Sequence, residues 1–318
     1  MDGMLEYTLC HGSGNRFVMV DGVLNADALG RMEPGELARS LCRPGELCPE
    51  RLDGLLLLCT AAEGYAMRMF NTDGSEAEMC GNGIRCVARM VRERYLHRDE
   101  FPLWSGGRRY AVRHERPLFG ALETYSVEIG IRTAGDEDFP RGGERFVAQP
   151  IPELDDGLRF TFLNLGNPHI VAEVGEIDIA RLERMGERIK ELREVFPRGI
   201  NCSIVRRDDE RRLFAATYER GVGLTNSCGT AMTASTTAAW LTGRCPADTE
   251  IEVRNRGGMV RCRVLSSGEG LATRLTGNAT FEVRGRLLVS GGALRGEPHD
   301  EYTGEQREYA RFIEAVTK

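Results

Sequence analysis

Residues 70–83 read FNTDGSEAEMCGNG, and residues 218–231 read YERGVGLTNSCGTA. In both stretches an aromatic residue ends a strand-like segment, and a Cys-Gly pair follows ten positions later. A helix-like stretch begins at each pair. The cysteines of the two pairs are Cys80 and Cys228. The match predicts an internal repeat in which each half carries one cysteine at the start of a helix.

A second pair of motifs supports the repeat. The sequence HGSGN at residues 11–15 precedes an apolar stretch, and NLGNPH at residues 164–169 does the same. The spacing from the Gly-Asn of these motifs to the cysteine is 65 residues in the first half and 61 in the second. Two matches in the same order, at similar spacing, indicate two homologous halves.

The helices after the two cysteines differ in polarity. Apolar residues recur at helical spacing after Cys80, with Arg85 and Arg89 between them, so this helix is expected to have one polar face. Residues 231–241 contain no charged residue, which predicts a buried helix that ends before Gly243. A further, exposed helix is expected over residues 178–193, and strands are expected at 55–58, 109–113, 250–253, 259–264 and 281–289.

These patterns predict an α/β fold with two pseudo-symmetric halves. Each half is expected to be a curved, mostly antiparallel sheet around a central helix, with the active site in the cleft between the halves. The first half should span residues 1–135 and be completed by a returning strand around 279–290, and the second should span 136–278. The tail, 291–318, is expected to hold a helix from 305 to 316, with no role that the sequence assigns.

Composition narrows the class of protein. The chain has 318 residues, of which 41% are hydrophobic and 28% charged, with a net charge of -6. This balance gives no reason to expect nucleic acid or an anionic membrane as a partner. No apolar run approaches the ~20 residues that span a bilayer, and the N-terminus does not resemble a secretory signal. We therefore expect a cytoplasmic protein whose ten cysteines are reduced.

Cofactor and metal motifs are missing from the sequence. The cysteines form no CxxC pair, and there is no GxGxxG or phosphate-loop motif. We also identify no site for pyridoxal phosphate. The sequence therefore predicts neither a metal nor a cofactor.

A cysteine at a helix start is placed for proton transfer. Unpaired backbone amides and the helix dipole are expected to lower the thiol pKa there. The same amides offer a cradle for a carboxylate at Gly81-Asn82 and at Gly229-Thr230. If both helix starts faced one small-molecule substrate, one sulfur would remove an α-proton while the other delivered a proton to the opposite face. That chemistry is stereoinversion by two bases, with the carbanion stabilised electrostatically.

The ordered motifs resemble those of the diaminopimelate epimerase family. They are HGSGN, FNTDGSE before CGNG, GNPH, YERGVG and CGT, in family order between residues 11 and 230, and the general pattern continues to about residue 290. The resemblance implies interconversion of LL- and meso-diaminopimelate without a cofactor, in lysine and peptidoglycan precursor supply. It also implies a homodimer.

The resemblance also implies roles for individual residues. Cys80 and Cys228 would be the catalytic acid and base, and His169 and Glu219 would adjust their protonation. The positions that match substrate-binding residues are Asn15, Asn71, Gly81, Asn82, Asn167, Asn201, Glu219, Arg220, Gly229 and Thr230. Of these, Asn71, Asn167, Asn201 and Arg220 would hold the distal amino-acid end of the substrate, where an arginine fork suits a second carboxylate.

The sequence departs from the family's usual pattern at several positions. Arg16 replaces an aspartate, Gly54 a glutamine, Leu224 a glutamate and Ala231 a glycine. These changes leave open a racemase of another amino acid on the same scaffold. The YERG motif and Asn71 favour diaminopimelate over proline, whereas histidine stays open.

Two classes outside the racemases are also open. A redox protein would join Cys80 and Cys228 in a disulfide. A non-catalytic metal or small-molecule binder would not need paired helix starts. In both alternatives the remaining cysteines are ordinary buried thiols.

Overall fold

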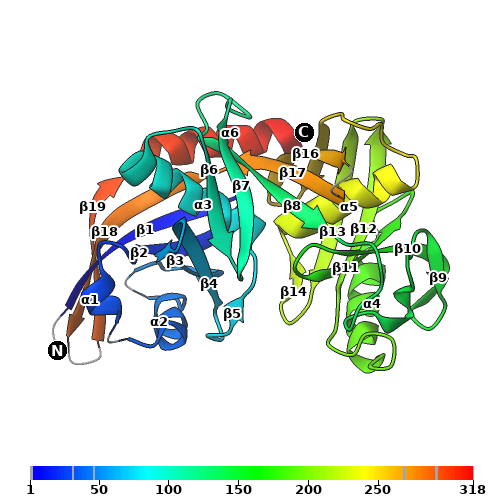
Figure 1. Ribbon diagram of the computed structural model, residues 1–318, viewed down its shortest axis with the longest axis horizontal. Coiled ribbons are helices and arrows are strands. Elements are labelled where there is room, and N and C mark those ends of the chain that lie inside the picture. Colours follow the sequence, from blue (N-terminus) through cyan, green and yellow to red (C-terminus); the bar gives the residue numbers. More distant parts are fainter. Residues whose placement is uncertain (1–2, 31, 46, 268–269, 291–292, 318) are drawn as a thin grey trace. The chain divides into compact units, whose positions relative to one another are not determined.

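In the computed structural model, the described residues are 3–30, 32–45, 47–267, 270–290 and 293–317. They form two compact units: unit 1 comprises residues 1–127 and 277–316, and unit 2 comprises residues 128–276. Figure 1 labels the elements of both units. No helix among the described residues has the length and apolarity needed to cross a bilayer.

Unit 1 is built mainly of strands. Its strands are β1 (Gly3–Gly12), β2 (Asn15–Asp21), β3 (Gly54–Ala61), β4 (Gly64–Asn71), β5 (Glu76–Ala77), β6 (Glu100–Ser105), β7 (Arg108–Glu115), β18 (Thr280–Ser290) and β19 (Ala293–Glu301). Its helical elements are α1 (Ala26–Leu29), α2 (Pro34–Leu41), α3 (Gly81–Val91), the π-turn η1 (Arg92–Leu96) and α6 (Thr303–Thr317).

Unit 2 has the same kinds of element. Its strands are β9 (Gln149–Ile151), β10 (Asp155–Asn164), β11 (Pro168–Glu173), β12 (Asn201–Asp209), β13 (Arg212–Glu219), β14 (Gly223–Thr225), β15 (Ile251–Asn255) and β16 (Gly258–Ser267). Its helical elements are η2 (Pro140–Gly142), α4 (Ile179–Glu191) and α5 (Gly229–Leu241). The strands β8 (Thr124–Ile131) and β17 (Gly270–Asn278) each contain a boundary between the units.

The strand pairings of the two units are the same. In unit 1, β1 pairs with β2, β2 with β3, β3 with β4, β4 with β6, β6 with β7 and β7 with β8. In unit 2 the corresponding series is β10, β11, β12, β13, β15, β16 and β17. The second and fourth pairings of each series are parallel, and the others are antiparallel. The repeat predicted from the cysteine motifs is thus present strand by strand, and the predicted α/β fold class is confirmed.

The sheet of each unit curves around the helix that begins after Cys80 or Cys228, which is α3 in unit 1 and α5 in unit 2. Helix α3 contacts β1, β2, β3, β4 and β7, which lie at both ends of the unit 1 series, and α5 contacts β10, β11, β12, β13, β15 and β16. A flat sheet could not bring strands from both ends to one helix. Each central helix is therefore enclosed by its own sheet.

The polar face that the sequence predicts for helix α3 is buried in the structure. The side chain of Arg85 is fully buried, and Arg89 is only 4% exposed. Arg89 donates to Glu305 at 2.6 and 2.7 Å, to Glu93 at 2.7 Å and to the Ala279 carbonyl at 2.8 Å. The sequence did not predict this burial, because the partners come from beyond α3, two of them from the C-terminal part of the chain.

Helix α5 is buried, as its composition predicts. Threonine hydroxyls along it donate to the carbonyls four residues earlier, for example from Thr233 to Gly229 at 2.9 Å and from Thr237 to Thr233 at 2.9 Å. Gly243 takes a positive φ of 72° after the last turn, and its N–H donates to the Trp240 carbonyl.

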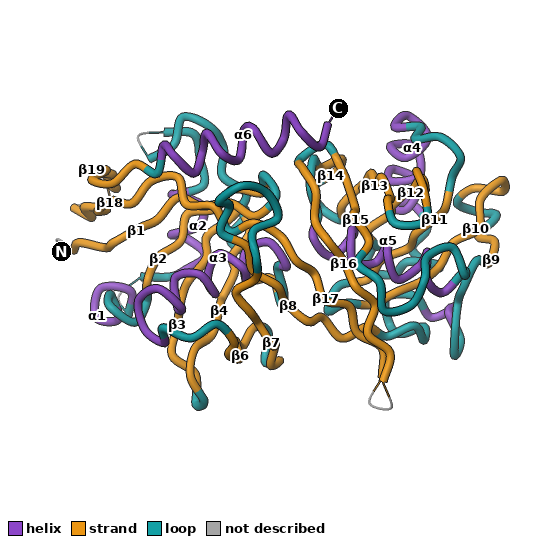
Figure 2. Tube along the Cα trace, turned by 90° about the horizontal axis from the view of Figure 1, so that it is seen from above, coloured by secondary structure: helices purple, strands orange, loops and turns teal. Residues whose placement is uncertain are grey.

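The C-terminal tail is part of unit 1. Strand β19 pairs antiparallel with β18, and Figure 2 shows the two strands side by side. In α6, the buried Phe312 packs against Phe119, and the ring of Tyr309 lies edge-on to that of His11, 4.2 Å between centroids. Residues 291, 292 and 318 of the predicted tail lie outside the described residues.

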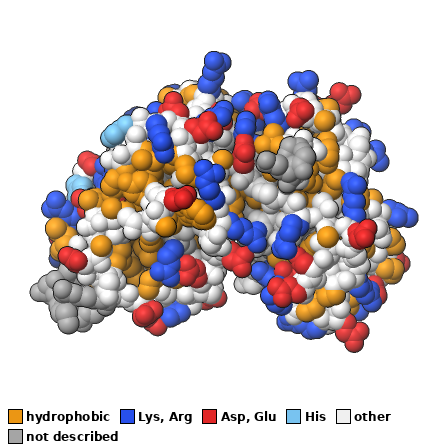
Figure 3. Space-filling model, in the orientation of Figure 1, with side chains coloured by type: hydrophobic (Ala, Val, Ile, Leu, Met, Phe, Trp, Pro, Cys, Tyr) orange, Lys and Arg blue, Asp and Glu red, His pale blue; other side chains and the backbone are white. Residues whose placement is uncertain are grey.

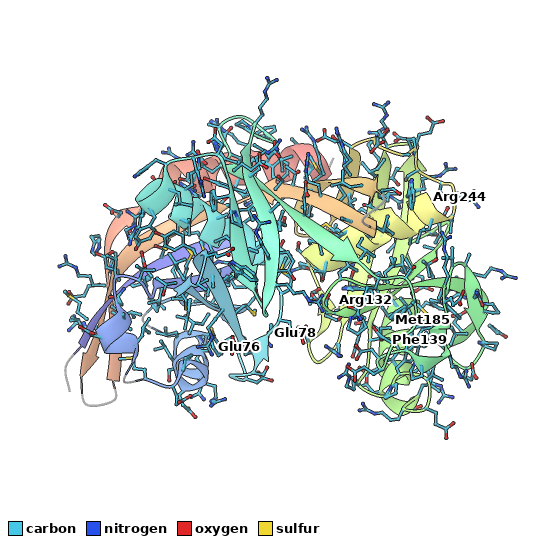
Figure 4. The ribbon with its side chains drawn as sticks, viewed as in Figure 1. Glu76, Glu78, Arg132, Phe139, Met185 and Arg244 are labelled. Atoms are coloured by element: carbon cyan, nitrogen blue, oxygen red, sulfur yellow. The ribbon has the colours of Figure 1, made fainter. Side chains whose placement is uncertain are left out.

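Both units have an apolar core on the side of the sheet that an outer helix covers. In unit 1, α2 packs Leu37 and Leu41 against β3. In unit 2, α4 packs Leu182 and Met185 against a core that includes Phe139 (Figure 4). Acidic and basic side chains are intermixed over the face seen in Figure 3, which fits the small net charge.

Candidate active site

In unit 1 the candidate site is the start of α3. Cys80 is the N-cap residue, with extended φ and ψ angles of −137° and 107°, and its Sγ accepts a hydrogen bond from the Gly83 N–H at 3.3 Å. An N-cap side chain satisfies an amide that has no partner within the helix. The helix start therefore holds the sulfur against its first-turn amides, as the sequence predicts.

Asn15 and Asn82 meet beside this sulfur. Asn15 follows the tight turn from β1 to β2, in which Gly14 has a φ of 77° and Ser13 N–H donates to Asn278 Oδ1 at 2.8 Å. Asn82 Nδ2 donates to Asn15 Oδ1 at 3.3 Å, and that oxygen lies 4.0 Å from Cys80 Sγ. Two predicted substrate-binding residues and one predicted catalytic residue are thus in mutual contact.

Asn71 lies at the end of β4, in the turn that leads to β5. Its Nδ2 donates to Ser75 Oγ at 3.0 Å, and its backbone N–H donates to the Ser75 carbonyl at 2.8 Å. These bonds hold Asn71 within its own turn.

In unit 2 the candidate site is the start of α5. Cys228 is the N-cap residue, with φ and ψ angles of −131° and 111°, close to those of Cys80. Its Sγ lies 3.4 Å from Thr230 Oγ1. The two cysteines therefore stand at equivalent positions in backbone conformation as well as in sequence.

A buried histidine organises the groups around Thr230. His169 Nε2 lies 3.1 Å from Thr230 Oγ1, 3.0 Å from Asn167 Oδ1 and 3.4 Å from Asn201 Nδ2. Burial, and then the charge of Arg220, lower the pKa of His169 to about 3, so the imidazole is neutral at neutral pH.

The end of β13 supplies the predicted charged pair. Glu219 accepts a hydrogen bond from Thr225 Oγ1 at 2.6 Å. The Arg220 N–H donates to Asn201 Oδ1 at 2.8 Å, and Arg220 Nη1 lies 3.7 Å from the Asp138 carboxylate. Asn167, His169, Asn201 and Thr230 are thus joined by short polar contacts, and the Arg220 backbone joins them through Asn201.

The pKa of the Cys228 thiol differs from the expectation for a helix start. Burial and then the nearby Glu219 carboxylate raise this pKa well above its usual value, while the Thr230 hydroxyl and the Ala231 N–H act in the opposite direction. Desolvation disfavours the thiolate more than two donors stabilise it. Cys228 is therefore protonated at neutral pH.

Two departures from the family pattern have structural explanations. Arg16 forms a two-pronged ion pair with Glu282, with Nε–Oε1 and Nη2–Oε2 distances of 3.0 and 2.7 Å. At Gly54, an added Cβ would lie 2.7 Å from the Phe70 carbonyl oxygen and 2.8 Å from Met69 Cε. Arg16 thus binds β18 of its own unit, and the backbone around Gly54 leaves no room for a glutamine.

Sequence reasoning missed several residues at the first helix start. Ser13, Arg85 and Asn278 all bond to the site's residues or to each other. Arg85 was detectable, since it stands two residues after the CGNG motif. Asn278 was not detectable, because it lies 265 residues from its partner Ser13 and belongs to no local motif.

Comparison with known proteins identifies the family. The model of the diaminopimelate epimerase family matches residues 7–116 and 161–282. The chain belongs to the diaminopimelate epimerase family. It is thus an epimerase, one of the isomerases.

Curated relatives support this family over nearly the whole chain. A diaminopimelate epimerase from Clostridium acetobutylicum is 33% identical, over 97% of this chain and 94% of the relative. One from Enterococcus faecalis is 34% identical, over 97% of both chains.

Solved structures show how widely the fold of this epimerase family is shared. A phenazine biosynthesis protein of the PhzF family from Bacillus anthracis matches with a TM-score of 0.64 at 16% identity, over 89% of this chain and 99% of the other. A hydroxyproline epimerase from Agrobacterium vitis, solved with trans-4-hydroxy-L-proline, matches with a TM-score of 0.61 at 14% identity, over 91% and 92%. At these identities the likeness concerns the fold alone.

Proposed function

We propose that this protein interconverts LL- and meso-diaminopimelate by moving the α-proton between Cys80 and Cys228, without a cofactor. The observation that carries the proposal is the equivalence of the two cysteines. Each is the N-cap of a buried central helix, with near-identical backbone angles and with amide or hydroxyl groups beside its sulfur. A one-base enzyme would need only one such helix start.

The proton balance of the reaction needs only these two groups. A thiolate on one side takes the α-proton, so that the C–H bond breaks, an S–H bond forms and the electron pair stays on the α-carbon. The thiol on the other side gives its proton to that carbon from the opposite face and becomes a thiolate. One turnover exchanges the protonation states of the sulfurs, and the reverse reaction restores them.

The helix starts supply the stabilisation that the carbanion needs. Negative charge that develops on the substrate carboxylate is favoured by unpaired N–H groups and by the positive end of the helix dipole. Gly81-Asn82 and Gly229-Thr230 are the first residues of α3 and α5, so their amides are the proposed carboxylate cradle.

The remaining polar groups of unit 2 set the state of Cys228. The neutral His169 and the Thr230 hydroxyl are joined at 3.1 Å, and Thr230 in turn contacts the sulfur. Glu219 favours the thiol form, through its effect on the Cys228 pKa. We propose that these three residues keep Cys228 ready to donate a proton.

The distal end of the substrate is assigned to Asn71, Asn167, Asn201 and Arg220. Asn201 accepts from the Arg220 backbone and contacts His169, so the distal residues and the proton-transfer residues form one network in unit 2. The Arg220 side chain is 40% exposed, which leaves its guanidinium able to bind a second carboxylate.

Exchange of the α-proton with deuterated water tests the substrate directly. The purified protein is incubated without cofactor with LL- and meso-diaminopimelate, L-histidine, L-proline and trans-4-hydroxy-L-proline, and deuterium incorporation is followed by NMR. We expect exchange with the two diaminopimelate isomers only. Exchange with histidine or a proline but not with diaminopimelate would overturn the substrate assignment.

Removal of either sulfur tests the two-base mechanism. Cys80→Ala and Cys228→Ala should each lower kcat at least 1,000-fold, the scale of a lost general acid or base. The double variant should be little worse than either, because residues that act as a unit are not additive. Cys202→Ala, at a buried cysteine on β12, is the control and should keep its activity. Turnover retained in either single variant would contradict the mechanism.

We further propose that the protein acts in the cytoplasm, as expected from its sequence, and that it forms a homodimer, as the family resemblance implies. Light scattering coupled to size-exclusion chromatography tests the oligomeric state. A mass near 35.3 kDa would indicate a monomer and contradict the proposal.

A further inference from the structure

Arg85, in the second turn of α3, is a fully buried arginine that donates hydrogen bonds to several uncharged acceptors. Its Nη1 donates to the Gly81 carbonyl at 2.7 Å, and its Nε donates to the Asn278 carbonyl at 3.2 Å. Its Nη2 donates to Asn82 Oδ1 at 3.0 Å and to Ser13 Oγ at 3.2 Å. A buried charge is costly unless such bonds compensate it. Here they tie the first residues of α3 to the turn before Asn15.

The surrounding backbone is shaped to hold this guanidinium. A Cβ on Gly12 would lie 2.9 Å from Arg85 Nη2, and a Cβ on Gly277 would lie 2.7 Å from the same atom. Both positions are therefore occupied by glycine where the side chain of Arg85 needs space. The two glycines come from opposite ends of the chain.

The bonds of Arg85 give the neighbouring amides a direction. A guanidinium has donors only, so the Asn82 amide must turn its oxygen towards Arg85. The Nδ2 of Asn82 then faces Asn15, which receives it on Oδ1 at 3.3 Å. Because Asn15 uses its oxygen as the acceptor for Asn82 and Cys80, its Nδ2 is left to act as a donor to another group.

The unit 2 site does not need such a group. Thr233 stands five residues after Cys228, as Arg85 does after Cys80, and its hydroxyl donates to the Gly229 carbonyl at 2.9 Å. Thr230 stands where Asn82 does, and a hydroxyl both donates and accepts without turning a whole amide. An arginine donor is therefore useful at α3, where Asn82 bonds in turn to Asn15 and both side-chain amides need a fixed direction.

We propose that Arg85 is a positioning residue of the epimerase reaction. By donating to Asn82 Oδ1 and to the Gly81 carbonyl, it fixes the direction of the Asn82–Asn15 pair, so that Asn15 Nδ2 and the first amides of α3 face the substrate carboxylate. This role rests on the proposed function. It assigns to Arg85 no contact with the substrate.

A double-mutant cycle between Arg85 and Asn82 tests the role. The variants are Arg85→Met, which keeps the length of the stem, Asn82→Ala, and the two together, each assayed for kcat/KM. Arg85→Met should lower kcat/KM on the order of 100-fold, as expected when a reacting group is misplaced by about 1 Å. The double variant should fall within about twofold of the worse single variant, because Arg85 acts through Asn82. Effects that multiply would overturn the proposal.

Arg89→Met is the matched control. Arg89 lies on the same helix one turn later and is also buried, but its hydrogen bonds go to Glu93, Glu305 and the Ala279 carbonyl. Its loss should lower Tm and leave kcat/KM within about twofold of wild type, and its effect should multiply with that of Asn82→Ala. A merely structural role of Arg85 would give the same pattern as Arg89.

Two further measurements keep the test decisive. If Arg85→Met does not fold, Arg85→Lys keeps the charge but not the fork, and the same cycle applies to it. The same double-mutant cycle can also be measured without catalysis. In each variant, the rate of Cys80 alkylation by iodoacetamide is followed by peptide mass spectrometry, with the rate of Cys228 alkylation as the internal reference. Exchange with an amino acid other than diaminopimelate contradicts the proposed function only, whereas additivity in the cycle contradicts only the role of Arg85.

Discussion

The two helix starts have the same backbone and different polar surroundings. At α3, an amide pair, Asn82 and Asn15, lies beside the sulfur and is oriented by Arg85. At α5, a hydroxyl, Thr230, lies beside the sulfur and is contacted by the neutral His169. The comparison shows that a repeated fold fixes where a thiol stands, whereas the residues around it can provide orientation by different chemical means.

Along their length, α3 and α5 also differ in their polar partners. Arg85 and Arg89 of α3 reach acceptors that include the backbone at Asn278 and Ala279. Several threonine hydroxyls of α5 bond within the helix, whereas those of Thr230 and Thr237 also bond outward, to His169 at 3.1 Å and to Thr273 at 2.9 Å. Among the described residues, the polar partners of α3 at Asn278, Ala279 and Glu305 thus lie farther along the chain from their helix than the partners of α5 at His169 and Thr273.

The largest expected effect on stability is at Arg89. Arg89→Met should lower the free energy of unfolding by about 3 kcal/mol, because Glu305 loses its partner in a mostly buried pair. Urea unfolding measures the change. Arg92→Met, in the next turn with an exposed partner Asp99, should cost about 0.5 kcal/mol or less. Equal losses of unfolding free energy in the two variants would contradict the expectation that the buried ion pair contributes more than the exposed one.

A smaller effect on stability is expected when the pH is lowered, with one buried histidine contributing from each unit. Burial lowers the pKa of His11 and of His169 to about 3, whereas an unfolded histidine titrates near 6.5. Between these values the unfolded chain binds protons that the folded one does not, so stability falls as the pH falls. Each histidine should contribute a slope of about 1.4 kcal/mol per pH unit below pH 6.

The two histidines serve as controls for each other in this measurement. His11→Asn and His169→Asn should each remove about half of the pH dependence of stability between pH 6 and pH 5, above the range where most carboxylates titrate. Urea unfolding at several pH values gives the slopes. A slope unchanged by both variants would show that neither imidazole is held neutral.

The smallest expected effect is within α5. Thr237→Val keeps the shape of the side chain but removes the bond to Thr273, whose hydroxyl is then left buried with one partner fewer. The expected loss is about 1 kcal/mol, measured by urea unfolding. A loss as large as that of Arg89→Met would mean that the helix of unit 2 depends on outside partners as much as that of unit 1.

Local patterns predicted the helix starts and the repeat, because both depend on motifs within a few residues of each cysteine. The burial of the polar face of α3 could not be predicted, since Arg85 and Arg89 have partners near residues 278 and 305, far beyond any local window. The direction of the Cys228 pKa also could not be predicted. It depends on burial and on the distance to Glu219, which no helix-start rule contains.

The division of the chain between the units affects the order in which the units can fold during synthesis. Unit 2 is one continuous segment, whereas unit 1 needs residues 277–316 to complete its sheet beside β1 and to receive the arginines of α3. A ribosome therefore delivers all of unit 2 before unit 1 can close, although unit 1 begins first. Until then, the growing polypeptide carries an open edge on β1, and the arginines of α3 lack their acceptors at Asn278, Ala279 and Glu305.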